Sequence, residues 1–169
     1  MKTFSRWRGT FSAYFLATVL FLADQVSKLL IEIFVIEPGI SFSVIPYFDF
    51  FRITYIHNPG AAWGILPGYN LLFVTVAVLV TVLCVVMIEK NPLDSVRYPW
   101  AMILGGGLGN MIDRIFKDSG VVDFLDVGVH AWRWPTFNIA DSSLCVGMIW
   151  LIYVTVWIEP REENQEHDD

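Results

Sequence analysis

Long apolar runs separated by short polar segments dominate the pattern of this chain. The clearest run extends from Tyr69 to Ile88, contains no charged side chain and ends at Glu89 and Lys90. A helix needs about 20 mostly apolar residues to cross a bilayer. The pattern predicts spans at about residues 9–34, 69–88, 98–116 and 138–158. We therefore expect an all-α integral membrane protein with four transmembrane helices, folded as a single membrane domain over residues 1–169.

The segment between the first two predicted spans, residues 35–67, has a different pattern. It is rich in Phe, Ile, Val and Tyr, and apolar and polar positions partly alternate, as in residues 50–55. Alternation with a period of two is typical of short strands. We expect a small β-rich cradle on the outer membrane surface here. An irregular aromatic loop at the interface is the alternative.

Basic residues next to the spans predict the orientation of the chain. Cytoplasmic loops of membrane proteins carry an excess of Lys and Arg. Three basic residues precede the first span, two flank the loop between the second and third spans, and residues 35–67 contain only Arg52. Arg114, Lys117 and Arg133 oppose this bias. We expect both termini in the cytoplasm, with residues 35–67 and 117–136 outside.

Composition agrees with a membrane protein and excludes several other classes. The chain is 55% hydrophobic and 17% charged, with a mean hydropathy of +0.54 and a net charge of −6. The segment 159–169 holds six acidic residues and one arginine, so it reads as an acidic cytoplasmic tail. A basic surface for nucleic acid is not expected. Two cysteines and three scattered histidines match no metal site, and we expect neither a metal nor another cofactor.

Unusual polar residues gather toward one predicted membrane surface. Charged groups within membrane spans are costly, and they usually face a cavity or a partner. The outer ends of the spans and the loops beside them carry Asp24, Lys28, Asn58, Asn110, Asp113, Arg114, Asp123, Asn138 and Asp141. We place the functional site at this surface.

Several of these residues also have a purely structural interpretation. Asp24 and Lys28 are four residues apart on a helix and could form an ion pair, or they could support the site. The glycines of residues 105–109 contain a GxxxG step, which favours close helix packing, and they do not fit a dinucleotide motif. Asn138 could cap the last helix.

Two carboxylates held close together can hydrolyse a peptide bond without a metal. Because both cannot ionise easily, one stays protonated and acts as an acid while the other acts as a base. Asp123 and Asp141 are the preferred pair, with Asp24, Asp113 and Asp126 as competitors. A serine mechanism would need His57 or His130 as base, and the chain has no nucleophile motif for it. A small ion-coupled transporter that uses intramembrane carboxylates is the alternative function.

Five ordered motifs resemble those of the lipoprotein signal peptidase (signal peptidase II) family. They lie at residues 24–28 (DQVSK), 57–64 (HNPGAAWG), 105–114 (GGGLGNMIDR), 121–124 (VVDF) and 137–142 (FNIADS). The chain departs from the family pattern at Trp63, where phenylalanine is common, and in its acidic tail. The resemblance covers residues 24–142 and predicts a protease of bacterial origin.

The resemblance implies specific roles and partners. Asp123 and Asp141 would be the catalytic pair, and Asn110, Arg114 and Asn138 would line the site. Further positions expected to bind substrate or support the site are Asp24, Lys28, Asn58, Gly60 and Asp113. The substrate would be a diacylglyceryl-modified prolipoprotein, cut before its lipidated cysteine in the bacterial inner membrane. Membrane lipid and the inhibitor globomycin would be further partners, and nothing demands more than a monomer.

Overall fold

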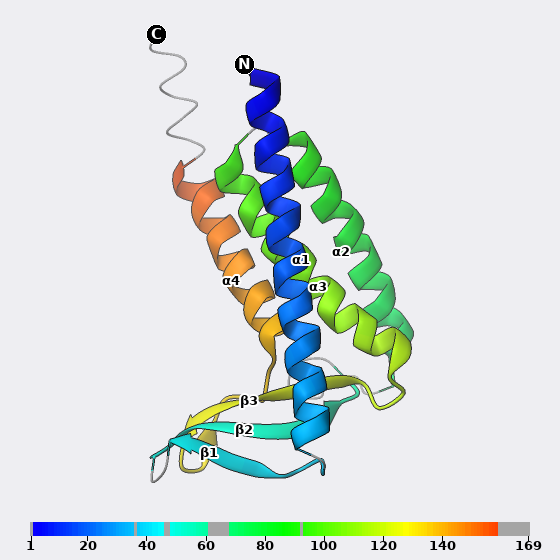
Figure 1. The fold of residues 1–169 in the computed structure, drawn as a ribbon, viewed down its shortest axis with the longest axis vertical. Coiled ribbons are helices and arrows are strands. Elements are labelled where there is room, and N and C mark those ends of the chain that lie inside the picture. Colours follow the sequence, from blue (N-terminus) through cyan, green and yellow to red (C-terminus); the bar gives the residue numbers. More distant parts are fainter. Residues whose placement is uncertain (1, 36, 46–47, 61–67, 92, 159–169) are drawn as a thin grey trace.

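Four long helices form a bundle that stands on a small sheet (Figure 1). The computed structural model describes the chain except for residues 1, 36, 46–47, 61–67, 92 and 159–169. The helices are α1 (Lys2–Phe34), α2 (Asn70–Lys90), α3 (Asp94–Phe116) and α4 (Ile139–Tyr153), and a π-helical turn, η2 (Val154–Ile158), continues α4. The helix α1 begins seven residues before the predicted first span, which starts at residue 9.

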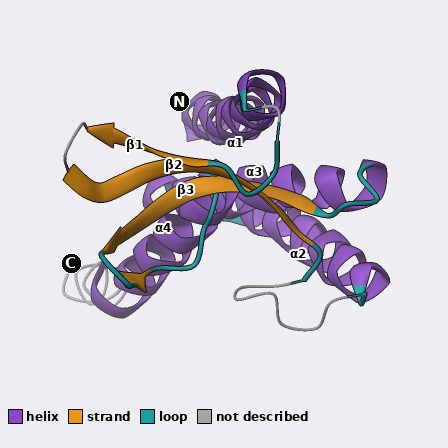
Figure 2. Ribbon diagram, turned by 90° about the horizontal axis from the view of Figure 1, so that it is seen from below, coloured by secondary structure: helices purple, strands orange, loops and turns teal. Residues whose placement is uncertain are grey.

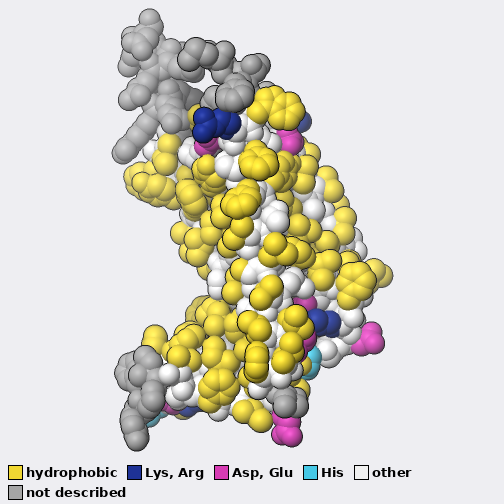
Figure 3. All heavy atoms as spheres, viewed as in Figure 1, with side chains coloured by type: hydrophobic (Ala, Val, Ile, Leu, Met, Phe, Trp, Pro, Cys, Tyr) yellow, Lys and Arg dark blue, Asp and Glu magenta, His cyan; other side chains and the backbone are white. Residues whose placement is uncertain are grey.

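Three helical segments of the described chain are long and apolar enough to cross a membrane: Trp7–Phe34, Asn70–Lys90 and Ile139–Ile158. Hydrophobic side chains cover the visible sides of the bundle (Figure 3). The helix α3 does not belong to this group, although it packs against the other three helices. Buried polar side chains on α3, among them Arg97, Asn110 and Asp113, explain its lower hydropathy. A fourth membrane span remains a prediction.

The sheet contains four antiparallel strands in the order β1-β2-β3-β4 (Figure 2). The strands β1 (Ser41–Ile45) and β2 (Phe48–Asn58) lie within the segment for which the sequence predicted strands. The strands β3 (Val121–Val129) and β4 (Trp132–Arg133) come from the segment between α3 and α4, and sequence reasoning missed them. The pairing of β2 with β3 carries residues 121–123 across the end of the bundle.

Glycines on α3 allow two neighbouring helices to approach its backbone. A Cβ atom on Gly105 would lie 2.6 Å from the carbonyl oxygen of Ala17 on α1. A Cβ atom on Gly106 would collide with the carbonyl oxygen of Ala140 on α4. A Cβ atom on the next residue, Gly107, would meet no neighbouring atom within 4 Å. The glycine-rich segment that contains the GxxxG step therefore serves helix packing, and Gly106 lets the first turn of α4 lie against α3.

We expect Gly105→Ala and Gly106→Ala to destabilise the bundle, because backbone atoms of α1 and α4 cannot move aside as a flexible side chain would. Overpacking of this kind typically costs about 1–3 kcal/mol. Gly107→Ala is the matched control, and it should be neutral or stabilising by up to about 1 kcal/mol because alanine favours a helix. Thermal unfolding in detergent measures the difference. Equal melting temperatures for all three variants would contradict this packing.

Candidate active site

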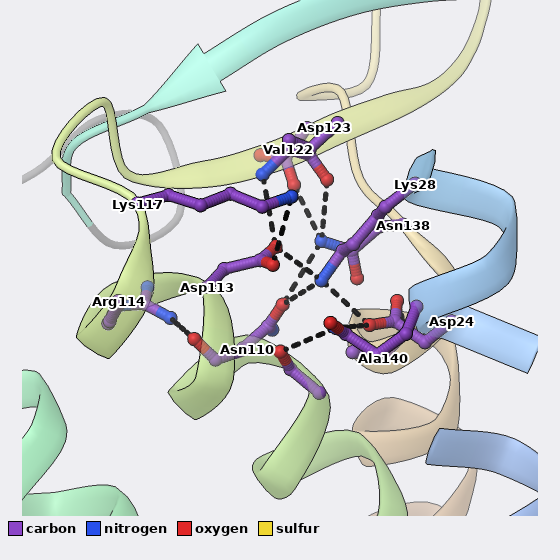
Figure 4. A network of polar contacts seen from close by, with 12 residues as sticks. Asp24, Lys28, Asn110, Asp113, Arg114, Lys117, Val122, Asp123, Asn138 and Ala140 are labelled. Atoms are coloured by element: carbon purple, nitrogen blue, oxygen red, sulfur yellow. Dashed lines mark hydrogen bonds and ion pairs between the residues drawn. The ribbon is translucent and has the colours of Figure 1, made fainter. Parts of the chain in front are cut away.

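Two of the predicted carboxylates meet where the sheet joins the bundle. Asp123 lies on β3 and is 3% exposed, and Asp141 lies in the first turn of α4 and is half-buried. The pairing of Ile56 on β2 with Asp123 holds this part of β3 in the sheet. Figure 4 shows Asp123 and Asn138 pointing toward each other from β3 and the start of α4.

Asn138 connects the two carboxylates and also caps α4. Its side-chain oxygen accepts a hydrogen bond from the backbone N–H of Asp141 at 2.9 Å, and its own backbone N–H donates to Asp141 Oδ2 at 3.2 Å. Its side-chain amide donates to Asp123 Oδ1 at 2.7 Å. The cap interpretation is thus correct, and the capping residue is also the link between Asp123 and Asp141.

Two further asparagines complete the hydrogen bonding of the carboxylates. Asn58, at the end of β2, donates to Asp123 Oδ2 at 2.9 Å. Asn110, on α3, donates to Asp141 Oδ1 at 2.7 Å. Each of the four carboxylate oxygens therefore accepts a hydrogen bond from an amide. Neutral donors hold a carboxylate in place, and they favour its ionised form less strongly than an adjacent cation would.

The surroundings of Asp123 favour its protonated form. Burial, followed by the negative charge of Asp141, raises the pKa of Asp123 to about 7, and the hydrogen bonds from Asn58 and Asn138 oppose this rise. A carboxyl group with this pKa can carry a proton near neutral pH and release it during a reaction.

The other aspartates named as competitors have basic partners. Lys28 forms ion pairs with Asp24 at 2.7 Å and with Asp113 at 2.9 Å, and Arg133 pairs with Asp126 at 2.6 Å. Within the part of the chain that the structure describes, no Lys or Arg forms an ion pair with Asp123 or Asp141. The ion pair between Asp24 and Lys28 that the sequence suggested is therefore present, and it is fully buried.

A pocket of about 570 Å³ opens beside Asp123 and Asp141. Its polar wall is formed by the residues that sequence analysis grouped, namely Asn58, Asn110, Arg114, Asp123 and Asp141. Its apolar wall comes from the segment after β4 and from α4, with Trp134, Phe137 and Val146 among the lining residues. Of these three residues only Phe137 lies in one of the sequence motifs, because Trp134 and Val146 resemble ordinary interface and membrane-helix residues. Figure 3 shows the surface hollowed between the bundle and the sheet.

Arg114 lies at the rim of this pocket on α3. Its guanidinium donates to the carbonyl oxygen of Gly60 at 3.1 Å and lies 5.2 Å from the ring centre of Phe73. The backbone N–H of Gly60 donates to the side chain of Asn58 at 3.0 Å. Gly60 thus links Arg114 to the asparagine that holds Asp123. A cation at this position can attract an anionic group such as a phosphate.

The serine mechanism finds no support in the geometry. The hydroxyl of Ser142 donates to the carbonyl oxygen of Asn138 at 2.9 Å, and Ser143 is buried. His57 lies within hydrogen-bond distance of the Tyr55 hydroxyl, at 3.0 Å, instead of a serine. Among the described residues, no group of three or more His, Cys, Asp or Glu side chains could hold a metal ion.

Comparisons with known proteins agree on one family. The model of the signal peptidase (SPase) II family matches residues 16–157. A lipoprotein signal peptidase of Janthinobacterium sp. (strain Marseille) is 38% identical over 144 residues, which cover 82% of this chain and 84% of that protein. One of Anoxybacillus flavithermus is 35% identical over 164 residues, covering 96% and 95%.

Solved structures point in the same direction. Two structures of bacterial membrane enzymes superpose on this fold, each with a TM-score of 0.76. They are 35% and 34% identical to this chain, and they cover 86% and 87% of it. The match extends over 87% and 94% of their own chains. The arrangement of helices and sheet is therefore shared with experimentally determined membrane enzymes.

Proposed function

Because the chain belongs to the signal peptidase II family, we propose that it is an aspartic endopeptidase with Asp123 and Asp141 as its catalytic pair. The protein is a multi-pass bacterial membrane protease that removes the signal peptide from prolipoproteins. One observation carries the assignment of the pair. Asp123 and Asp141 are two carboxylates at one pocket, each held by amides, and no ion pair among the described residues involves either of them.

The pair can hydrolyse a peptide bond by acid–base catalysis. The ionised carboxylate takes a proton from a water molecule, and the water oxygen forms a bond to the scissile carbonyl carbon. The protonated carboxyl gives its proton to the carbonyl oxygen, which produces a neutral tetrahedral diol. The C–N bond then breaks, a diol proton returns to one carboxylate, and the amine leaves with the proton that the other carboxyl received from water. The raised pKa of Asp123 suits it to the acid role in the first step.

The substrate we propose carries a diacylglyceryl group on the cysteine that follows the scissile bond. Such a substrate moves in the plane of the membrane and presents its peptide bond near the surface. The pocket combines an apolar wall, which includes Trp134 and Val146, with the cationic group of Arg114 at its rim. We propose that acyl chains lie along the apolar side, that Arg114 attracts lipid phosphate, and that globomycin inhibits by occupying the same pocket.

The proposed setting is the bacterial inner membrane. In this arrangement α3 is the fourth span, both termini lie in the cytoplasm, and the sheet and Asp123 lie at the outer surface. The aromatic and aliphatic side chains exposed on the sheet, such as Phe42, Phe50 and Trp132, are suited to a membrane interface. We propose that a monomer is sufficient for activity, since residues of a single chain supply both carboxylates and the lining of the pocket. The transporter alternative is not favoured, because the relatives are signal peptidases.

We expect Asp123→Asn and Asp141→Asn each to reduce cleavage of a lipid-modified prolipoprotein by at least about 10³-fold, because removal of one partner of a catalytic unit disables the whole unit. Both proteins should still insert and fold, since asparagine preserves the shape of the side chain. The measurement is the gel shift of the purified substrate in detergent, with and without globomycin.

Two other aspartates provide the controls for this experiment. Asp118 is exposed and lies, like Asp123, in the segment between α3 and α4. Asp126 lies on the same strand as Asp123 but pairs with Arg133. Asp118→Asn should retain wild-type activity, and Asp126→Asn should retain most of it. Full activity in either Asp123→Asn or Asp141→Asn would rule out the pair.

We expect kcat/KM to fall as the pH rises above about 7, because Asp123 then loses the proton that it donates. Asn58→Ala should move this alkaline limb to higher pH, since the hydrogen bond from Asn58 lowers the pKa of Asp123. Loss of a hydrogen bond to a charged group costs about 1.5 kcal/mol. This energy corresponds to a shift of the alkaline limb by about one pH unit.

Asn70→Ala is the matched control for the pH profile. Asn70 is an exposed asparagine whose amide donates to the carbonyl oxygen of Arg114 at 2.6 Å, and it has no contact with Asp123. The Asn70→Ala protein should show the same alkaline limb of kcat/KM as the wild type. An alkaline limb that stays in place, or moves to lower pH, in Asn58→Ala would refute Asp123 as the acid.

A further inference from the structure

Lys28 lies behind the proposed catalytic pair and does not line the pocket. Its side chain is fully buried and belongs to α1, which contributes no lining residue to the pocket. A lysine ammonium has three hydrogen-bond donors. Three acceptors surround it, Asp24 Oδ2 at 2.7 Å, Asp113 Oδ2 at 2.9 Å and Asn110 Oδ1 at 3.1 Å. The donors of Lys28 are therefore used in full by groups of the protein.

Each carboxylate partner of Lys28 holds the backbone next to one catalytic aspartate (Figure 4). Asp24 Oδ1 accepts a hydrogen bond at 2.9 Å from the backbone N–H of Ala140, which directly precedes Asp141. Asp113 Oδ2 accepts one at 3.4 Å from the backbone N–H of Val122, which directly precedes Asp123. One ammonium thus connects two chains of contacts, one through Asp24 and one through Asp113, that end beside the two aspartates.

The third partner of Lys28 joins the two chains of contacts at their centre. Asn110 accepts from Lys28 and from the side-chain amide of Asn138, at 3.1 Å in each case, through the same oxygen. The amide nitrogen of Asn110 is thereby directed at Asp141 Oδ1, to which it donates at 2.7 Å. An ammonium group can only donate hydrogen bonds, so the side-chain oxygen of Asn110 must face Lys28. The amide nitrogen of Asn110 is therefore the end that faces Asp141.

We propose that Lys28 is a positioning residue that sets the placement of Asp123 relative to Asp141. The inference rests on the proposed function and assigns Lys28 a role apart from substrate contact. Consecutive Cα atoms are a fixed 3.8 Å apart, so anchoring residues 122 and 140 restricts the backbone at residues 123 and 141. The carboxylates of Asp24 and Asp113 would repel each other without the shared ammonium, and both anchors would shift.

A second lysine in the same network serves as an internal control. Lys117 also pairs with Asp113, at 3.2 Å, but it is about a quarter exposed and its other partner is Glu32 on α1, at 2.7 Å. It contacts neither Asp24 nor Asn110 in any ion pair or hydrogen bond of the described residues. Lys117→Met should therefore remove a comparable charge from Asp113 and leave the link between the two anchors intact.

The test measures kcat and KM for cleavage of a lipid-modified prolipoprotein by three variants of the full chain and by the Lys117→Met control. Lys28→Met removes the ammonium. Lys28→Met combined with Asp24→Asn and Asp113→Asn removes all three charges and keeps oxygen acceptors for Ala140 and Val122, so this neutral combination should fold even if the single variant does not. Asp24→Asn alone leaves Lys28 paired with Asp113.

We expect the neutral combination to melt close to the wild-type temperature and to lose about 100-fold in kcat, since small misplacements of catalytic groups cost this much. Its KM should stay within about threefold, because the pocket wall is unchanged. Asp24→Asn should lose about tenfold in kcat through its weaker anchor at Ala140. Lys117→Met should keep kcat within about twofold, as expected for a partly exposed pair.

Three outcomes would overturn the proposal. The first is a wild-type kcat in the folded neutral combination, and the second is a loss of cleavage activity that appears in KM alone. The third is failure of all three variants to fold, which would make the cluster only a folding element. Wild-type cleavage and its loss in Asp123→Asn are measured in the same assay. If those two results fail, the proposed function is wrong; if they hold and kcat survives without Lys28, only the positioning role is wrong.

Discussion

The rest of this structure depends on the compensation of buried carboxylates. Asp24, Asp113 and Asp123 are all buried where the bundle meets the sheet, and an uncompensated charge there would cost several kcal/mol. The buried carboxylates are compensated in two ways. Asp24 and Asp113 share a lysine, whereas the carboxylate oxygens of Asp123 and Asp141 receive amide hydrogen bonds. The first solution stabilises ionised groups, and the second leaves a group that can change its protonation.

Helix packing places these groups within reach of each other. Gly105 and Gly106 let α1 and α4 approach the backbone of α3, so that polar side chains from three helices share one layer. The polar character of α3 follows from this position, because its side chains face other helices and β3 more than the surroundings. A helix at the centre of a bundle can tolerate Asn110 and Asp113 since its neighbours supply their partners.

The sheet contributes the other half of the site. Asp123 sits on β3, whose pairing with β2 also brings Asn58 to the same carboxylate. The chain between β4 and α4 then closes one side of the pocket with Trp134 and Phe137. This pocket lies between a strand and the start of an apolar helix. That location suits a substrate that arrives within the membrane plane.

Much of this fold could be predicted from local signals along the chain. Apolar runs marked α2 and α4, alternation marked the region of β1 and β2, and the spacing of Asp24 and Lys28 marked an ion pair. The ordered motifs identified the family. Three features could not be predicted in this way: Lys28 also reaches Asp113, Asn138 contacts both Asp123 and Asp141, and β3 is a strand. Those contacts join residues from different elements, and no periodicity along the chain encodes which of several possible partners a buried polar group will meet.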